Sequence, residues 1–162
     1  MYYRFTDAEK RSAIRVKTSI EYDYVEEFQN PTSLIGASFS IYKGKKLFDL
    51  IGFCEVVNFA ISRRFKTLLE ENRITGWSCY PIKIENIEDE YFGFHVEGKG
   101  GSCINRDKDG LIPMFKPVLF DENKWDQSDI FNIDDTGIIA CVPKVKDLVE
   151  KAKITNVELR PL

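Results

Sequence analysis

The chain has 162 residues, of which 43% are hydrophobic and 13% aromatic; this suits a single folded domain spanning residues 1–162 and excludes a disordered chain. Its formal net charge of −3 gives no overall positive field to attract phosphates, so nucleic acid is not an expected partner. No window has the roughly 20 apolar residues that span a bilayer, and the N-terminus lacks the apolar stretch of a signal peptide. We therefore expect a cytoplasmic protein with no membrane partner and with reduced cysteines.

Strand-like runs and two amphipathic helices follow one another irregularly along the chain. The expected strands are rich in aromatic and β-branched residues and cover 37–42, 53–59, 77–84, 91–96, 137–142 and 157–159. Ser62 can cap a first helix that runs through about Asn72, and Pro143 suits the first turn of a second helix. Both helices have apolar residues on one face. Because strands outnumber helices and do not alternate regularly with them, the pattern predicts an α+β fold with a mixed or antiparallel sheet.

The two helical regions resemble each other when the sequence is shifted by 80 residues. Residues 60–82 align without gaps to residues 140–162. Seven positions are identical: Ala60/Ala140, Lys66/Lys146, Leu68/Leu148, Glu70/Glu150, Ile74/Ile154, Thr75/Thr155 and Pro81/Pro161. This alignment predicts two similar strand–helix–strand units that pack their helices on a shared sheet. The alternative is a coincidence between two amphipathic helices that are each followed by a strand.

The strongest candidate for a binding surface is the acidic segment 120–137, FDENKWDQSDIFNIDDTG. An exposed Trp among carboxylates suits a basic protein partner, because aromatic anchors dominate interface energy and rim charges steer the encounter. The alternative is that Trp125, Phe120 and Phe131 turn inward and hold a surface loop in place. The candidate partner-binding residues are Asp121, Glu122, Trp125, Asp126, Asp129, Asp134 and Asp135.

Catalytic and metal-binding patterns are poorly represented. The only histidine, His95, lacks a motif that supplies a nucleophile or an orienting carboxylate, and no nucleophile signature surrounds Cys103. The cysteine spacing does not match a zinc site. Residues 105–110 begin like a calcium-binding loop, but Lys116 stands where the bidentate glutamate should be. We therefore predict no catalytic centre, no metal and no cofactor.

Four segments together resemble a family of bacterial immunity proteins from polymorphic toxin systems. These segments are ISRRFKTLLEENRITGWSCYPI, YFGFHVEGKGG, FKPVLFDENKWDQSDIF and KVKDLVEKAKITNVELRPL, and they occur in this order within residues 56–162. Residues 1–55 match the family only loosely, through Tyr2 and Tyr3. The GKGG turn differs from the family's more usual GRCG-like turn.

The resemblance implies a non-enzymatic protein that binds and neutralises a cognate toxin. It transfers no catalytic residues to this chain. Two other hypotheses stay open at this point: a small-molecule enzyme that uses Cys103 and His95, and an interaction module unrelated to toxins.

Overall fold

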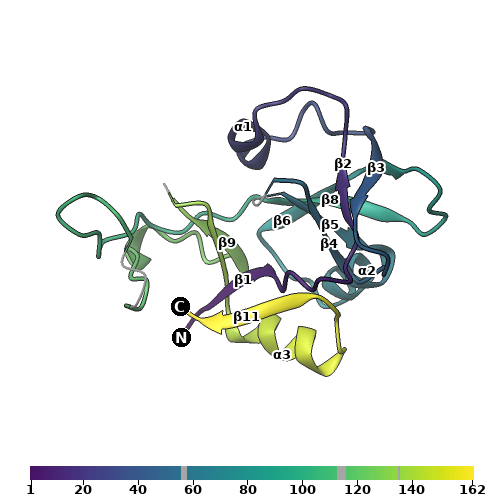
Figure 1. The fold of residues 1–162 in the computed structure, drawn as a ribbon. Helices are drawn as coiled ribbons and strands as arrows, with labels where there is room; N and C mark the ends of the chain where they lie inside the picture. The colour runs from purple at the N-terminus through teal and green to yellow at the C-terminus, as the bar shows by residue number, and fades with distance from the viewer. Residues whose placement is uncertain (56–57, 113–115, 135) are drawn as a thin grey trace.

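The structure, a computed structural model, describes residues 1–55, 58–112, 116–134 and 136–162. These residues form three α-helices and eleven β-strands, which confirms the α+β class (Figure 1). In chain order the elements are β1 (Tyr3–Asp7), β2 (Arg15–Lys17), α1 (Tyr24–Gln29), β3 (Ser38–Lys43), β4 (Leu50–Phe53), β5 (Phe59–Ser62), α2 (Arg63–Glu71), β6 (Trp77–Pro81), β7 (Lys83–Ile84), β8 (Tyr91–Val96), the 3₁₀ helix η1 (Glu122–Lys124), β9 (Ile130–Ile133), β10 (Ile138–Cys141), α3 (Pro143–Lys151) and β11 (Val157–Pro161). None of the helices in the described ranges has the length and apolarity to cross a bilayer.

The strands form two sheets. The smaller sheet has the order β11-β1-β10-β9 and is antiparallel throughout. The larger has the order β6-β8-β5-β4-β2-β3-β7, and it is mixed because β2 runs parallel to β4 and β3 runs parallel to β7. The two strand–helix–strand units therefore lie in different sheets and not on the one shared sheet that we expected.

The correspondence between residues 80 positions apart continues on the N-terminal side of residues 60 and 140, where the sequence alignment began. Leu50 of β4 lies opposite Ile61 of β5. Their shifted counterparts, Ile130 of β9 and Cys141 of β10, also lie opposite each other. We call β4, β5, α2 and β6 the first unit, and β9, β10, α3 and β11 the second unit. Their common register supports a true internal repeat and not a coincidence of two helices.

Each unit receives its central strand from outside the unit. β8 lies between β5 and β6, and β1 lies between β10 and β11. In the larger sheet, Phe94 of β8 pairs with Cys79 of β6. In the smaller sheet, Phe5 of β1 pairs with Leu159 of β11, and Leu159 is the counterpart of Cys79 after the 80-residue shift. β1 precedes the first unit in the chain but inserts into the second, and β8 precedes the second unit but inserts into the first. Each unit is therefore completed by the strand that precedes the other unit.

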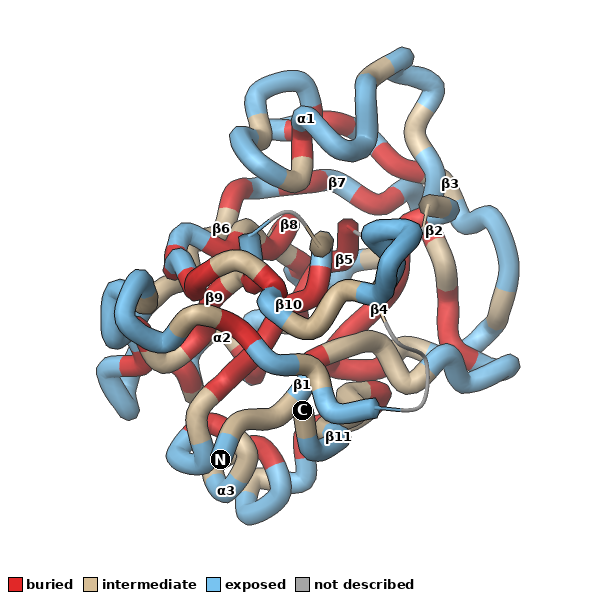
Figure 2. The backbone as a smooth tube through the Cα atoms, turned by 90° about the vertical axis from the view of Figure 1, so that its left-hand side faces the viewer, coloured by how far each residue is buried: buried red, intermediate tan, exposed pale blue. Residues whose placement is uncertain are grey.

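Aromatic side chains from both sheets meet in one core. The rings of Phe5 and Phe94 stack with centroids 6.1 Å apart, although the two residues belong to different sheets. Phe94 also stacks on Phe59 at 5.1 Å and on Trp77 at 5.6 Å. The inward faces of both amphipathic helices join this cluster, and the buried stretches of β5, β8 and β10 lie at the centre of the molecule (Figure 2).

Both predicted helices are confirmed, and several strand boundaries are corrected. The Ser62 hydroxyl accepts from the Phe65 amide at the start of α2, and Pro143 occupies the first turn of α3. The predicted strand 53–59 is wrong, because β4 ends at Phe53 and β5 begins only at Phe59. The predicted strand 77–84 is divided after Pro81, which has no amide hydrogen to continue a ladder.

Helix α1 is short, and a buried carboxylate attaches it to the loop that follows. Glu27 is only 4% exposed, and it accepts hydrogen bonds from the backbone amides of Thr32 at 2.9 Å, Ser33 at 2.8 Å and Leu34 at 3.3 Å. Burial raises the pKa of Glu27, but these hydrogen bonds outweigh burial and the net pKa lies below the usual value.

We expect Glu27→Gln to lower the free energy of unfolding by about 2 kcal/mol at neutral pH, because an amide cannot accept all of these bonds. A lowered pKa in the folded state means that the stabilisation is complete above the ordinary pKa of Glu and is lost as the pH falls through the folded-state value. Denaturant unfolding at neutral and acidic pH measures this difference, which should shrink in acid. Glu26→Gln, on the exposed side of α1, is the control. Equal stability of the two variants would contradict the assignment.

Candidate functional site

The acidic segment lies beside the smaller sheet and contains both η1 and β9. Trp125 is half-buried in a cluster with Tyr2 and Phe131, at centroid distances of 5.5 and 5.3 Å. Its indole nitrogen is buried and has no hydrogen-bond partner among the described residues. The ring therefore packs inward, which was the alternative to an exposed anchor, and it fixes the segment against the sheet.

Two carboxylates of the segment hold its backbone in place. Asp126 accepts from the Lys99 amide at 2.8 Å and from the Ser128 amide and hydroxyl at 3.0 and 2.5 Å. Burial raises the pKa of Asp126, but these donors outweigh burial and lower the net pKa. Asp121 caps η1 by accepting from the Asn123 amide at 3.2 Å. Both carboxylates thus stabilise one conformation of the loop.

Asp129 has a structural partner in the first unit. Its carboxylate accepts from the Thr75 amide at 3.0 Å and hydroxyl at 3.3 Å, and it pairs with Lys144 at 3.2 Å. The Asp129 amide donates back to the Thr75 hydroxyl at 3.0 Å. Asp129 therefore joins the turn before β6 to the start of β9, which the charge pattern alone did not reveal.

The remaining predicted residues of the segment divide by exposure. Glu122 and Asp134 are exposed at the surface. Asp135 lies outside the described residues. Asp126 is exposed as well, but its carboxylate accepts hydrogen bonds from the loop. Among the described residues of the segment, Glu122 and Asp134 are therefore the exposed carboxylates that hold no backbone amide, and Glu122 lies near the Tyr2 hydroxyl, where its charge adds to the effect of burial in raising the pKa of Tyr2.

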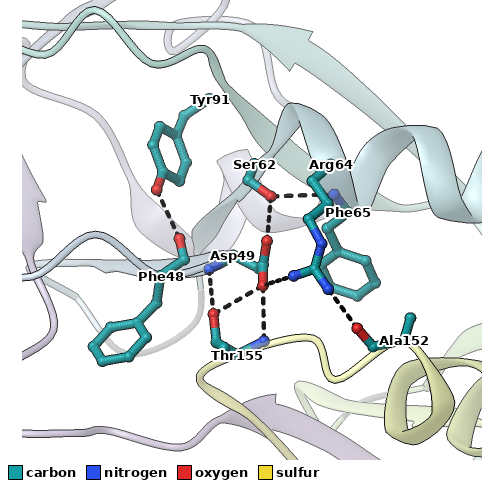
Figure 3. Close-up of polar contacts among 8 residues, drawn as sticks. All are labelled: Phe48, Asp49, Ser62, Arg64, Phe65, Tyr91, Ala152 and Thr155. Atoms are coloured by element: carbon teal, nitrogen blue, oxygen red, sulfur yellow. Dashed lines mark hydrogen bonds and ion pairs between the residues drawn. The ribbon is translucent and has the colours of Figure 1, made fainter.

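A second Asp–Thr pair, which sequence reasoning missed, joins Asp49 to Thr155 (Figure 3), and both residues line a cleft. Asp49 accepts from the Ser62 hydroxyl at 2.8 Å and from Arg64 at 2.7 Å. It also accepts from the Thr155 amide at 2.9 Å and hydroxyl at 2.8 Å. The Asp49 amide donates to the Thr155 hydroxyl at 2.9 Å. We call this arrangement the Asp49 clasp.

The Asp49 clasp is the repeat counterpart of the Asp129 pair, which we call the Asp129 clasp. Shifting Asp49, Arg64 and Thr75 by 80 residues gives Asp129, Lys144 and Thr155. In each clasp the aspartate of one unit accepts from the threonine of the other unit, and a basic residue of the following helix pairs with the carboxylate. Both aspartates could have been found by extending the 80-residue sequence alignment towards the N-terminus, where it pairs Asp49 with Asp129.

The cleft beside Asp49 has a volume of about 350 Å³, and several of its polar groups are engaged in hydrogen bonds and ion pairs. Arg63 pairs with Glu90, and Arg64 also donates to the Ala152 carbonyl. The Tyr91 hydroxyl donates to the Phe48 carbonyl at 2.7 Å, and burial raises its pKa. Because the Asp49 carboxylate accepts four hydrogen bonds, its arrangement suits a structural clasp better than a general base.

Cys103 and His95 have different neighbours. The Cys103 thiol donates to the Asn105 side-chain oxygen at 3.1 Å and packs against Phe120. His95 lies on β8 opposite Ser78 in the larger sheet, and burial lowers its pKa. None of the contacts recorded for either side chain within the described ranges joins the two residues.

The segment 105–110, which begins like a calcium-binding loop, is held by the side chain of Asp107. Asp107 accepts from the amides of Asp109 and Leu111, each at 2.9 Å, and Gly110 has a φ of 79°. Pro113, which follows this segment in the sequence, lies outside the described residues. In the part of the chain that the structure describes, no group of three or more His, Cys, Asp or Glu residues is placed to hold a metal ion.

Scans against protein-family models and curated protein sequences found no match for this chain.

Proposed function

We propose that this chain is a cytoplasmic immunity protein that binds and neutralises a cognate bacterial toxin domain, without catalysing a reaction itself. The resemblance of residues 56–162 to immunity proteins supports this function. The observation that carries it is the acidic segment, which presents Glu122 and Asp134 on a backbone fixed by Trp125 and Asp126. A preordered surface loses less conformational entropy on binding than a mobile loop.

The proposed partner presents a basic surface. Toxins that bind nucleic acid carry positive charge where they contact the phosphates, and an acidic inhibitor can cover that surface. Carboxylates at the rim of such an interface act mainly by accelerating association and by excluding partners with the wrong charge.

We expect a toxin domain to be encoded beside this gene, and the proposal is tested with that domain. We expect a stable complex, and we expect Glu122→Lys with Asp134→Lys to weaken binding about tenfold or more, mainly through slower association. Surface plasmon resonance at two salt concentrations measures both rates. Glu85→Lys with Glu88→Lys, a pair of exposed acids on another segment, makes the same charge change as a control.

Two results would contradict the proposal. The absence of a complex with the wild-type chain would contradict toxin binding. Equal weakening by the control pair would show that net charge, and not the acidic segment, determines affinity. Trp125 and Asp129 are poor probes here, because both hold the fold together and their loss would mix instability with weaker binding.

A further inference from the structure

Six exposed cationic residues gather on a face formed by two N-terminal segments. The β2–β3 pairing places Arg15 opposite Lys43, and the amides of Lys45 and Lys46 donate to the Ser12 carbonyl at 3.0 and 2.8 Å. These contacts bring the two segments together. The basic face consists of Lys10, Arg11, Lys17, Lys43, Lys45 and Lys46.

A glycine permits the close approach of these segments. Gly44 has a φ of 83°, and a Cβ at this position would lie 1.9 Å from the Ala13 carbonyl oxygen. A larger residue would push the two basic segments apart, so the fold itself keeps the charges close together.

The basic face lacks internal compensation. Among the ion pairs of the described residues, none includes any of its six members. The nearby carboxylates of Asp7 and Glu9 pair instead with Arg15, at 3.0 and 3.7 Å. A chain with a net charge of −3 therefore carries a concentrated positive surface.

Aromatic rings hold several of these ammonium groups in place. The nitrogens of Lys10 and Lys46 each lie 5.1 Å from the centroid of the Phe48 ring. The nitrogen of Lys17 lies 5.7 Å from the ring of Tyr42, which is 54% exposed. Ordered cations lose less side-chain entropy when an anion binds them.

We propose that the basic face binds an acidic segment of a protein partner, with the exposed ring of Tyr42, beside Lys17, as its apolar contact. Single-stranded nucleic acid needs a series of rings on which successive bases stack, and the face presents only Tyr42 among its described residues. This feature favours a protein segment.

The basic face is separate from the acidic segment. In Figure 1, β2 and β3 lie on the right, whereas the described residues that lead into β9 extend to the left. The inference does not depend on toxin binding, because a partner on the basic face has the opposite charge to a partner on the acidic segment.

The test measures binding of a synthetic peptide that alternates Glu and Leu, by fluorescence anisotropy at about 0.15 M salt, where long-range charge effects are screened. We expect Lys45→Gln with Lys46→Gln to weaken binding about fivefold. Tyr42→Ser should weaken binding of this peptide but not of an oligoglutamate with the same charge. Lys151→Gln with Lys153→Gln, two exposed lysines at the end of α3, is the matched control and should leave affinity unchanged.

Three results would overturn the inference: no binding of the peptide by the wild-type chain, equal weakening by the control pair, or tighter binding of a single-stranded oligodeoxynucleotide with the same charge. Circular dichroism of each variant checks that the fold is retained. Because the assay contains no toxin, its failure would leave the proposed function standing, and the toxin assay fails or succeeds independently.

Discussion

Replacing Asp49 by alanine is expected to lower the free energy of unfolding by about 3 kcal/mol, because it leaves buried donors without an acceptor. Asp49 is 7% exposed, and its carboxylate receives hydrogen bonds from Ser62 and from both polar groups of Thr155. Arg64 contributes less, because its side chain is 55% exposed and solvent screens the ion pair. Urea unfolding followed by circular dichroism measures the loss.

The repeat supplies an internal comparison for this prediction. Asp129→Ala should destabilise in the same direction by about 2 kcal/mol, because fewer hydrogen bonds converge on Asp129 and its side chain is 17% exposed. A double-mutant cycle of Asp49→Ala with Thr155→Val should show strong coupling. Destabilisation below about 0.5 kcal/mol for Asp49→Ala, the range of an ordinary surface change, would contradict the structural role of the clasp.

Truncation of Phe94 to alanine is expected to cost about 4 kcal/mol, as for other large-to-small changes in a packed core. Phe94 is 5% exposed and stacks on rings from both sheets, including Phe5 and Trp77. Thermal unfolding monitored by tryptophan fluorescence measures the loss. The exposed ring of Tyr24 provides the control, because Tyr24→Ala should change stability by less than about 0.5 kcal/mol. If the two variants were equally stable, the sheets would not share this core.

Both helices could be predicted from the sequence because their signals are local. Ser62 caps the first helix, Pro143 begins the second, and apolar residues recur at helical spacing in each. The strand Tyr91–Val96 was also predicted with its observed bounds, because its aromatic run ends at polar residues on both sides. Local chemistry was sufficient for these elements.

The missed strands depend on partners that are distant in sequence. β1 is a strand because it inserts between β10 and β11, near the other end of the chain. β9 was interpreted as part of an acidic surface segment, but Phe131 is fully buried and pairs with Ala140. A surface interpretation based on charge could not anticipate a buried strand within the segment.

The candidate site, too, could be predicted only in part, because the roles of its carboxylates depend on partners that are distant in sequence. Charge patterning identified the acidic segment, but it could not tell carboxylates that hold the loop from carboxylates that face solvent. Asp126 is as exposed as Glu122 and Asp134 by residue class, yet Asp126 and Asp129 accept the hydrogen bonds that hold the loop. Extending the repeat to Asp49 and Asp129 would have assigned a structural role to Asp129 from sequence alone.

The most direct test of the proposed function is growth of cells that express the adjacent toxin domain. Co-expression of the wild-type chain should restore growth, and the Glu122→Lys and Asp134→Lys double variant should restore it only in part at matched protein levels. Cells that die equally with and without the folded wild-type chain would contradict the proposal that this protein neutralises that toxin.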